Sequence, residues 1–265
     1  ACTTALREAG LGRVVFGASD PNPAHNGRAA AVLAEAGIAV EGGIEEAGCE
    51  LLIRPFSKVQ RTGLPWVTIK TAMSLDGRIT RPPGEGPWLS GPEARREVQS
   101  LRLQSDAILT SGRTVRADDP RLTLREIEVP PGKEQPWRVV LTSRDSGVPD
   151  SAALRTDRHA ARTLIYAGRR LEGVLRELVS EHGVCSVLVE AGGRLVGRLV
   201  DEDWADEIVV YLTPLITGGG LRGFGGEGVE GLAARRGLDE VAFERFGPDV
   251  RLRARFAESG HPLER

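Results

Sequence analysis

The stretch DAILTSGRTVRADDPRLTLR, residues 106–125, decides our interpretation of the fold. The apolar run at 107–109 predicts a buried strand, and Gly112 marks its end. The chain then carries two like charges, Asp118 and Asp119, directly before a proline. Because ligands in open α/β sheets bind beyond the carboxyl ends of the strands, polar residues in this position indicate a site.

Strand and helix patterns alternate on both sides of this stretch. A helix is predicted to start at Ser90–Pro92, because proline is tolerated at the first helical position. The alternation predicts an α/β protein with a mostly parallel sheet flanked by helices. A C-terminal antiparallel hairpin closed at 247–249 makes that sheet mixed. Further strands are predicted at 66–70, 138–143, 162–167, 184–190 and 206–214, and further helices at 171–183 and 193–202.

Residues 1–58 have a pattern of their own, which predicts two β-α pairs. Helices are expected at 3–10 and 27–37. The proline and glycine of RTGLP, residues 61–65, interrupt both periodicities and predict a linker. We therefore expect two domains, at 1–60 and 61–265.

Composition limits the possible partners and environment. The 35 basic and 37 acidic residues are not segregated, which disfavours nucleic acid as a partner. Three widely spaced cysteines without a C-x-x-C pair disfavour a disulfide framework and a complete structural zinc site, and indicate a reducing cytoplasm. No stretch approaches the roughly 20 apolar residues of a membrane helix, so no membrane partner is expected. The chain begins at Ala1 without a methionine, which we interpret as a fragment or a processed form.

The segment VLVEAGGRLVGRLV, residues 187–200, is the first candidate site. A strand ends at Glu190, two glycines allow a sharp turn, and the helix that follows presents N–H groups suited to a dinucleotide diphosphate. The glycine pattern differs from G-x-G-x-x-G, so a tight connection without a ligand is an equally good interpretation. Glu190 would repel a phosphate. It either accepts from substrate N–H groups or is satisfied by backbone groups or an arginine.

Three other strand ends carry candidate residues. Lys70 can donate to a carbonyl or a sugar hydroxyl, or can be a solvated edge residue. LTLR at 122–125 alternates like a strand and places Arg125 opposite its two leucines. Arg125 and Arg102 would form a phosphate site if they converge, whereas each alone is more simply a solvated charge. Ser143 could hold the ribose of NADP. The sequence has no H-x-E, G-x-S-x-G or P-loop motif.

Four segments resemble, in order and separation, the reductase domain of the bifunctional riboflavin-biosynthesis deaminase-reductase family. They are KTAMSLDGR (70–78), GEGPWLS (84–90), LRLQSDAILTSGRTVRADDPRLTLR (101–125) and VLVEAGGRLVGRLV (187–200). The resemblance implies a dihydrofolate-reductase-like fold. Residues 1–58 resemble the end of the family's deaminase domain, where Cys2 matches the last zinc-binding cysteine. The remaining zinc ligands and the general-acid glutamate are missing, so zinc and deamination would require a longer, bifunctional parent chain.

The resemblance also implies the site residues. The expected catalytic residues are Lys70, Glu190 and Asp118. NADPH is expected to contact Met73, Trp88, Thr114, Asp118, Ser143, Gly192, Gly193, Arg194, Leu195, Val196, Gly197 and Arg198. The substrate is expected to contact Lys70, Arg102, Leu122, Arg125 and Glu190, and Gly86 stands where the family usually has a substrate-contacting serine.

The implied activity is that of a 5-amino-6-(5-phosphoribosylamino)uracil reductase, in which NADPH delivers hydride to C1′ of the ribosyl group. Arg102 and Arg125 would hold the 5-phosphate, Glu190 would accept from uracil N–H groups, and Lys70 would donate to the sugar or assist ring opening. Two alternatives stay open: an NADPH-dependent reductase of another pterin-like or nucleotide-like molecule, indicated by Gly86, and a noncatalytic NADP-binding or assembly protein. The resemblance also implies a homo-oligomer.

Overall fold

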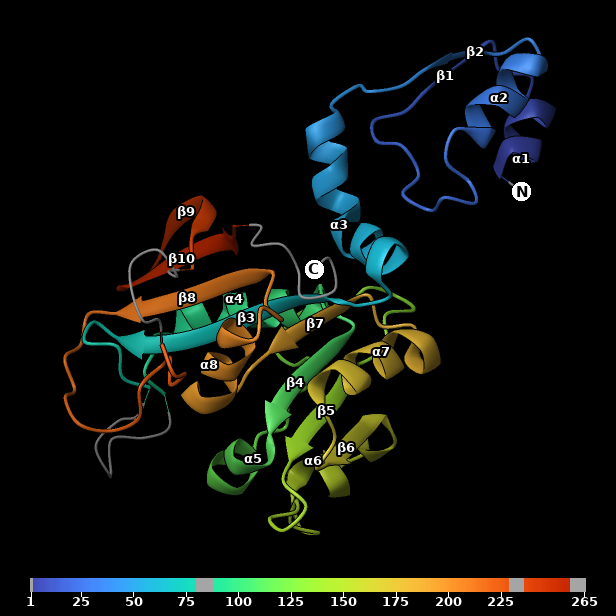
Figure 1. Cartoon of the computed structure of the whole chain (residues 1–265). Coiled ribbons are helices and arrows are strands. Elements are labelled where there is room, and N and C mark those ends of the chain that lie inside the picture. The colour runs from blue at the N-terminus through green and yellow to red at the C-terminus, as the bar shows by residue number, and fades with distance from the viewer. Residues whose placement is uncertain (1, 80–87, 229–235, 258–265) are drawn as a thin grey trace. The chain divides into compact units, whose positions relative to one another are not determined.

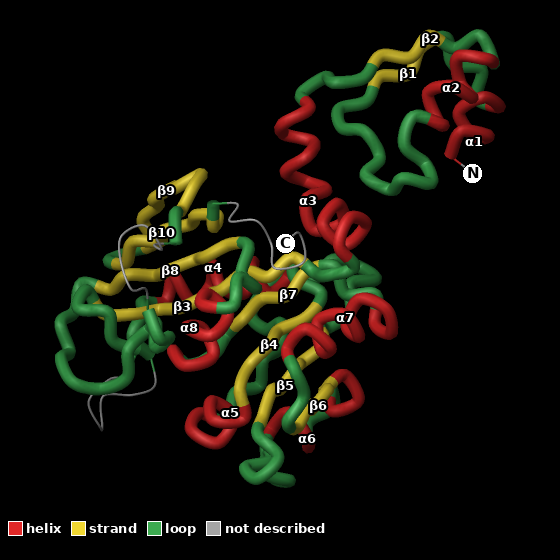
Figure 2. The backbone as a smooth tube through the Cα atoms, viewed as in Figure 1, coloured by secondary structure: helices red, strands yellow, loops and turns green. Residues whose placement is uncertain are grey.

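The computed structural model describes residues 2–79, 88–228 and 236–257, which divide into two compact units (Figures 1 and 2). The first unit comprises the described part of Ala1–Trp66 together with Leu175–Cys185. The second comprises the described parts of Val67–Val174 and Ser186–Arg265. No helix in these ranges is both long and apolar enough to cross a membrane.

The first unit contains both predicted β-α pairs and a helix that the sequence did not predict. β1 pairs in parallel with β2, although each strand is short. The unpredicted helix, α3, has Pro55 in its interior, which interrupts the helical pattern in the sequence. Because α3 continues to Thr62, the predicted linker at 61–65 is wrong in its first two residues. The elements of this unit are α1 (Cys2–Glu8), β1 (Arg13–Val15), α2 (Arg28–Glu35), β2 (Ala39–Glu41) and α3 (Glu46–Thr62).

The second unit is built on a mixed sheet with the strand order β6-β5-β4-β7-β3-β8-β10-β9 (Figure 1). The β5–β6, β4–β5, β4–β7 and β3–β8 pairs are parallel, and β10 pairs antiparallel with both β8 and β9. The strands are β3 (Trp66–Ser74), β4 (Ala107–Ser111), β5 (Trp137–Thr142), β6 (Thr163–Ala167), β7 (Ser186–Val189), β8 (Glu207–Thr213), β9 (Leu238–Phe246) and β10 (Asp249–Phe256). The helices are α4 (Pro92–Leu103), α5 (Gly112–Asp118), α6 (Ala153–Thr156), η1 (Ala160–Arg162) and α8 (Gly193–Asp201). A further helix, α7 (Leu171–His182), begins in this unit, but its residues from Leu175 onward belong to the first unit. The predicted mostly parallel, mixed sheet with a terminal antiparallel hairpin is confirmed.

Two local predictions are wrong. β3 continues to Ser74, so Lys70 lies within the strand rather than at its end. The segment LTLR at 122–125 is not a strand, because Leu122 has a left-handed backbone with φ of 50°. Thr123 is also buried, together with the two leucines, so the predicted alternation of faces does not occur.

α4 covers the sheet face on which Lys70 lies. Its buried residues Ala94, Val98 and Leu101 form the predicted apolar face, which packs against residues of β7 and β8. Ala72, two residues beyond Lys70 and therefore on the same face of β3, packs against this cluster. Lys70 is thus held beside α4 by the strand register.

The glycines of α8 are explained by close packing against a later segment of the chain. A Cβ atom at Gly193 would lie 2.0 Å from the carbonyl oxygen of Arg222, and one at Gly197 would lie 2.0 Å from the backbone nitrogen of Gly226. Gly192 is different, because the nearest atom to a Cβ there would be Thr114 Oγ1 at 3.9 Å. Two of the glycines in GG-x-x-x-G therefore serve helix packing.

We expect Gly193→Ala to destabilise the protein by about 1–3 kcal/mol or more, because the added methyl group meets rigid backbone. Gly192→Ala is the matched control, since its methyl group would only reach ordinary van der Waals contact with Thr114 and its φ of −72° suits alanine. Urea unfolding of both variants measures the difference. Equal unfolding midpoints for the two variants would contradict this account of α8.

Candidate functional site

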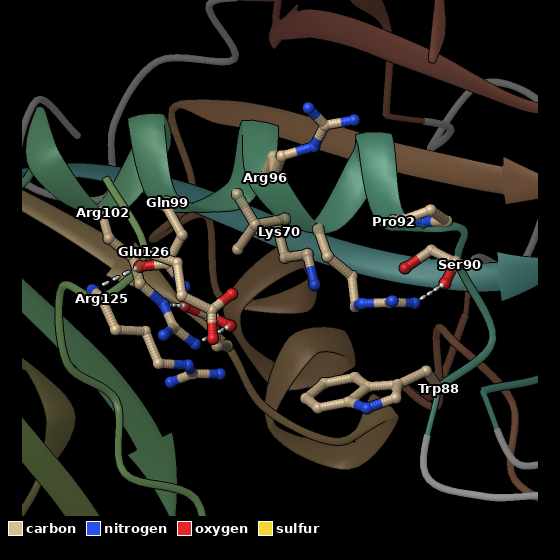
Figure 3. A pocket seen from close by; sticks show the side chains of 12 residues that line it. Lys70, Trp88, Ser90, Pro92, Arg96, Gln99, Arg102, Arg125 and Glu126 are labelled. Carbon is tan, nitrogen blue, oxygen red and sulfur yellow. Dashed lines mark hydrogen bonds and ion pairs between the residues drawn. The ribbon is translucent and has the colours of Figure 1, made fainter. Parts of the chain in front are cut away.

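A cavity of about 450 Å³ opens beside α4 in the second unit. Figure 3 shows Lys70, Arg102 and Arg125 pointing toward it from three different parts of the chain: β3, α4 and the segment that follows α5. The cavity therefore brings together the predicted residues Lys70, Arg102, Arg125 and Glu190. The complete lining is Lys70, Trp88, Ser90, Pro92, Arg95, Arg96, Val98, Gln99, Arg102, Arg125, Glu126 and Glu190.

A buried ion pair between Arg102 and Glu190 forms one wall of the cavity. Arg102 Nε donates to Glu190 Oε1 over 2.6 Å, and Nη2 donates to Oε2 over 3.0 Å. The two side chains are only 8% and 13% exposed. Arg102 was expected to hold phosphate, but the structure gives its guanidinium a different partner. Of the interpretations of Glu190 that the sequence left open, the observed pairing agrees with the one in which an arginine satisfies the carboxylate.

Arg102 also reaches the loop that carries Arg125. Its third interaction runs from Nη1 to the carbonyl oxygen of Thr123, over 3.1 Å. The backbone of Glu190 is fixed to β4, because its N–H donates to Leu109 and its carbonyl accepts from Thr110. Both members of the pair are therefore immobilised.

The charges of the cavity residues depend on one another. Burial opposes ionisation of Glu190, but the charge and hydrogen bonds of Arg102, together with the charges of Lys70 and Arg125, outweigh burial and lower the pKa of the carboxyl group. Burial lowers the pKa of Lys70, which the Glu190 carboxylate partly offsets. Lys70 Nζ also lies 5.9 Å from the centroid of the Tyr211 ring. The site thus holds a firmly ionised carboxylate beside an ammonium group that gives up its proton more readily than usual.

Arg125 faces the cavity without an ion-pair partner among the described residues. Its backbone N–H donates to Gln99 Oε1 over 3.2 Å, which ties the loop to α4. Burial and the nearby Arg102 guanidinium lower the pKa of Arg125, since its positive charge is poorly compensated. An anionic ligand would supply that compensation.

Several lining residues were missed by the sequence analysis. Arg95 and Gln99 lie seven and three residues before the predicted Arg102 on α4, a helical spacing that could have identified them. Arg95 lies over the ring of Trp88, 5.6 Å from its centroid, and donates to the carbonyl oxygen of Ser90. Glu126 was missed because it belongs to a loop without periodicity.

Other expected residues lie outside this cavity. Met73 is buried, its carbonyl oxygen accepting from Thr213, and Leu122 is buried in the loop. Asp118 is an exposed residue at the end of α5. Its carboxyl group is nevertheless partly shielded from water, which raises its pKa. Ser143 is exposed after β5. Gly86 falls outside the described residues, and Cys2 is exposed at the start of α1.

The start of α8 and Thr114 form a second group of expected residues that the structure brings together. Thr114 Oγ1 accepts from the N–H of Gly192 over 3.3 Å and lies 2.9 Å from Ser111 Oγ. Within the described ranges, the backbone N–H groups of Gly193 and Arg194 make no hydrogen bond, although Gly193 is buried. This arrangement suits an anionic group.

The mixed sheet with its antiparallel hairpin, which carries a cavity lined by basic residues, has the architecture of a dihydrofolate-reductase-like domain. The family model of the RibD C-terminal domain matches residues 65–252. The chain belongs to this family, the RibD-type reductases of riboflavin biosynthesis.

Relatives extend the similarity beyond the family model. The riboflavin biosynthesis protein RibD of Escherichia coli is 36% identical over 94% of this chain and 76% of its own length. The structure of Acinetobacter baumannii RibD (form 1) is 31% identical, with a TM-score of 0.87 over 97% of this chain and 76% of that chain. The riboflavin biosynthesis reductase Rib7 of Saccharomyces cerevisiae shares the fold, with a TM-score of 0.57 and 18% identity over 79% of this chain and 99% of that chain.

We expect Glu190→Gln to destabilise the protein at neutral pH by about 3–5 kcal/mol, because Arg102 is left buried without its counterion. The folded-state pKa of Glu190 lies below its ordinary value of 4.5, so the ionised pair stabilises the protein above that pH. The difference from the parent protein should shrink as the pH falls through the folded-state pKa. Urea unfolding across a pH series measures it.

The matched control is Glu202→Gln, which breaks the exposed Arg198–Glu202 pair on α8. That change should cost no more than about 1 kcal/mol. Equal losses in the two variants would show that the Arg102–Glu190 pair contributes no more than a surface pair.

Proposed function

We propose that the protein is a 5-amino-6-(5-phosphoribosylamino)uracil reductase that uses NADPH to reduce C1′ of the ribosyl group. The observation that carries the proposal is the convergence of Lys70, Arg125 and the Arg102–Glu190 pair on one cavity in a RibD-type reductase. A phosphorylated sugar attached to a pyrimidine has the three matching features: an anion, a polar sugar and ring N–H groups.

Arg125 binds the 5-phosphate in this proposal. Its guanidinium faces the cavity without an ion-pair partner in the described part of the chain, and its planar fork can donate to two phosphate oxygens. Arg102 contributes indirectly, because it is already paired with Glu190. This revises the expected two-arginine clamp.

Glu190 accepts from the uracil N–H groups. Each carboxylate oxygen already accepts one bond from Arg102, but a carboxylate has about four lone-pair positions and can accept more. Its lowered pKa keeps it ionised at neutral pH, so it remains an acceptor. Arg102 thereby fixes both the charge and the orientation of the group that recognises the base.

Lys70 protonates the sugar ring oxygen as the ring opens. Burial lowers the pKa of Lys70, which makes its ammonium group a stronger acid. The nearby Glu190 carboxylate acts in the opposite direction and favours the protonated form, which is the form that can donate a proton. Lys70 lies within β3 rather than on a loop, so its backbone is held rigidly by the sheet.

NADPH supplies the hydride in this proposal. The start of α8 is the proposed diphosphate site, since the N–H groups of Gly193 and Arg194 make no hydrogen bond within the described ranges and Thr114 bonds to the adjoining Gly192. Met73, Trp88, Asp118, Ser143 and the remaining residues of Gly192–Arg198 stay proposed cofactor contacts. Val196 is fully buried, so neither its side chain nor its main chain is exposed in this structure.

We also propose that residues 1–60 derive from a deaminase-like domain and that 61–265 form the reductase domain. The family model starts at residue 65, which supports this division. A homo-oligomer and a cytoplasmic location likewise remain proposals.

Arg125→Ala should raise the KM for the pyrimidine substrate by about 10- to 100-fold, because one to two charge-assisted bonds to phosphate are lost. The KM for NADPH should change little. The control is Arg96→Ala, since Arg96 also lies at the cavity but points away from it in Figure 3. Steady-state kinetics with both substrates tests this, and an unchanged KM in Arg125→Ala refutes the phosphate assignment.

Lys70→Met should lower kcat by about 10²- to 10⁴-fold, the usual contribution of a general acid. In the parent protein the protonated lysine is the active form, so kcat should fall as the pH rises through a pKa below 10.5. The variant should lose this alkaline limb. A pH profile of kcat with the limb unchanged in Lys70→Met would assign the acid to another group.

A further inference from the structure

Arg138, outside the cavity, makes contacts that a core residue does not require. It lies on β5 and is 1% exposed. Its Nη1 and Nη2 form a two-pronged pair with Asp157 over 2.6 and 2.9 Å, and Nη2 also donates to the carbonyl oxygen of Leu154 over 3.0 Å. Burying a guanidinium is costly, and an apolar residue could fill the same volume. The charge therefore calls for an explanation beyond packing.

The explanation lies in a further bond from Arg138 to the loop that carries Arg125. Arg138 Nη1 donates to the carbonyl oxygen of Arg121 over 3.1 Å. That carbonyl belongs to the peptide group directly before Leu122, so its orientation is coupled to the φ angle of Leu122. Arg138 thus acts on the point where the loop departs from ordinary backbone geometry.

The loop adopts a conformation that local sequence preferences do not favour. Asp119, Leu122 and Glu126 have φ values of 40°, 50° and 59°, in the left-handed region. For residues other than glycine this costs about 1–3 kcal/mol each, and such geometry persists only when the surroundings impose it. The cost is greatest for a bulky residue such as Leu122.

Four side chains impose this geometry by bonding to consecutive parts of the loop backbone. Arg138 holds the carbonyl of Arg121, and Arg102 holds that of Thr123. Gln135 holds both the N–H and the carbonyl of Leu124, and Gln99 accepts from the N–H of Arg125. Arg102 and Gln99 line the cavity, whereas Arg138 and Gln135 are not among its lining residues.

We infer that Arg138, held in place by Asp157, is a positioning residue that fixes the left-handed turn at Leu122 and so aims Arg125 at the ligand phosphate. The inference rests on the proposed function for the role of Arg125. Its effect on the loop backbone does not depend on any ligand. The two parts can therefore be measured separately.

The test compares Arg138→Met and Asp157→Asn with Val139→Ala in the full chain. Val139 is the next residue of β5 and is fully buried, so shortening it should destabilise the core without touching the loop. Hydrogen exchange of residues 121–126 reports the loop, and calorimetric titration with ribose 5-phosphate reports the anion site. Fluorescence titration with NADPH reports the cofactor site, and urea unfolding reports stability.

Arg138→Met should speed exchange in residues 121–126 and weaken ribose 5-phosphate binding by about tenfold or more, since a small misplacement of a binding group can have large effects. Asp157→Asn should change both in the same direction by less, because the neutral amide still accepts one bond. NADPH affinity should stay the same in both. Val139→Ala should lower the unfolding midpoint and leave both loop readouts at the parent values.

Three outcomes overturn the inference in distinguishable ways. If Val139→Ala speeds loop exchange as much as Arg138→Met does, Arg138 is merely structural. If Arg125→Ala weakens ribose 5-phosphate binding but Arg138→Met and Asp157→Asn do not, positioning by Arg138 fails while the proposed function stands. If Arg125→Ala itself leaves binding unchanged, the phosphate site of the proposed function fails as well. If Arg138→Met does not fold, Asp157→Asn tests the same inference, because the carboxylate of Asp157 is partly exposed and its replacement disturbs the core less.

Discussion

The site depends on the ion pair between Arg102 and Glu190, because that pair joins the sheet, a covering helix and a loop at one point. Glu190 follows β7, Arg102 lies in the last turn of α4, and Arg102 also holds the carbonyl of Thr123. A pair this deeply buried gains little net stability over an apolar substitute, but either partner alone is strongly destabilising. The interaction therefore favours one placement of the sheet, the helix and the loop relative to one another. That placement sets the positions of the side chains that face the ligand.

The cavity is consequently formed before a ligand arrives. Lys70 is held within β3, Glu190 is held by Arg102 and β4, and the loop of Arg125 is held by side chains from α4 and β5. Groups that are fixed in advance lose little conformational entropy on binding. For the proposed reaction this matters further, because hydride transfer requires close and oriented approach of donor and acceptor. The strained backbone at Leu122 is part of the cost of this arrangement.

Periodicity in the sequence predicted the sheet and the apolar face of α4, because these are local signals, whereas the grouping of Lys70, Arg102, Arg125 and Glu190 was expected from the resemblance to the reductase family. It failed where long-range contacts decide the geometry. The left-handed turn at Leu122 is imposed by side chains distant in sequence, including Arg138, so LTLR looked like a strand. The partner of Arg102 could not be read from α4 alone. Pro55 concealed α3, because proline is unfavourable in the interior of a helix and interrupts the helical pattern in the sequence.

The contact between α8 and the Arg222–Gly226 segment restricts how this surface can diverge during evolution. Gly193 and Gly197 cannot acquire side chains unless the facing main chain retreats, and the two segments must therefore change together. Arg194 and Arg198 are exposed on the same helix and carry no such restriction. Lineages that altered the charge presented at this end of α8 would be expected to do so at the arginines, with the glycines unchanged.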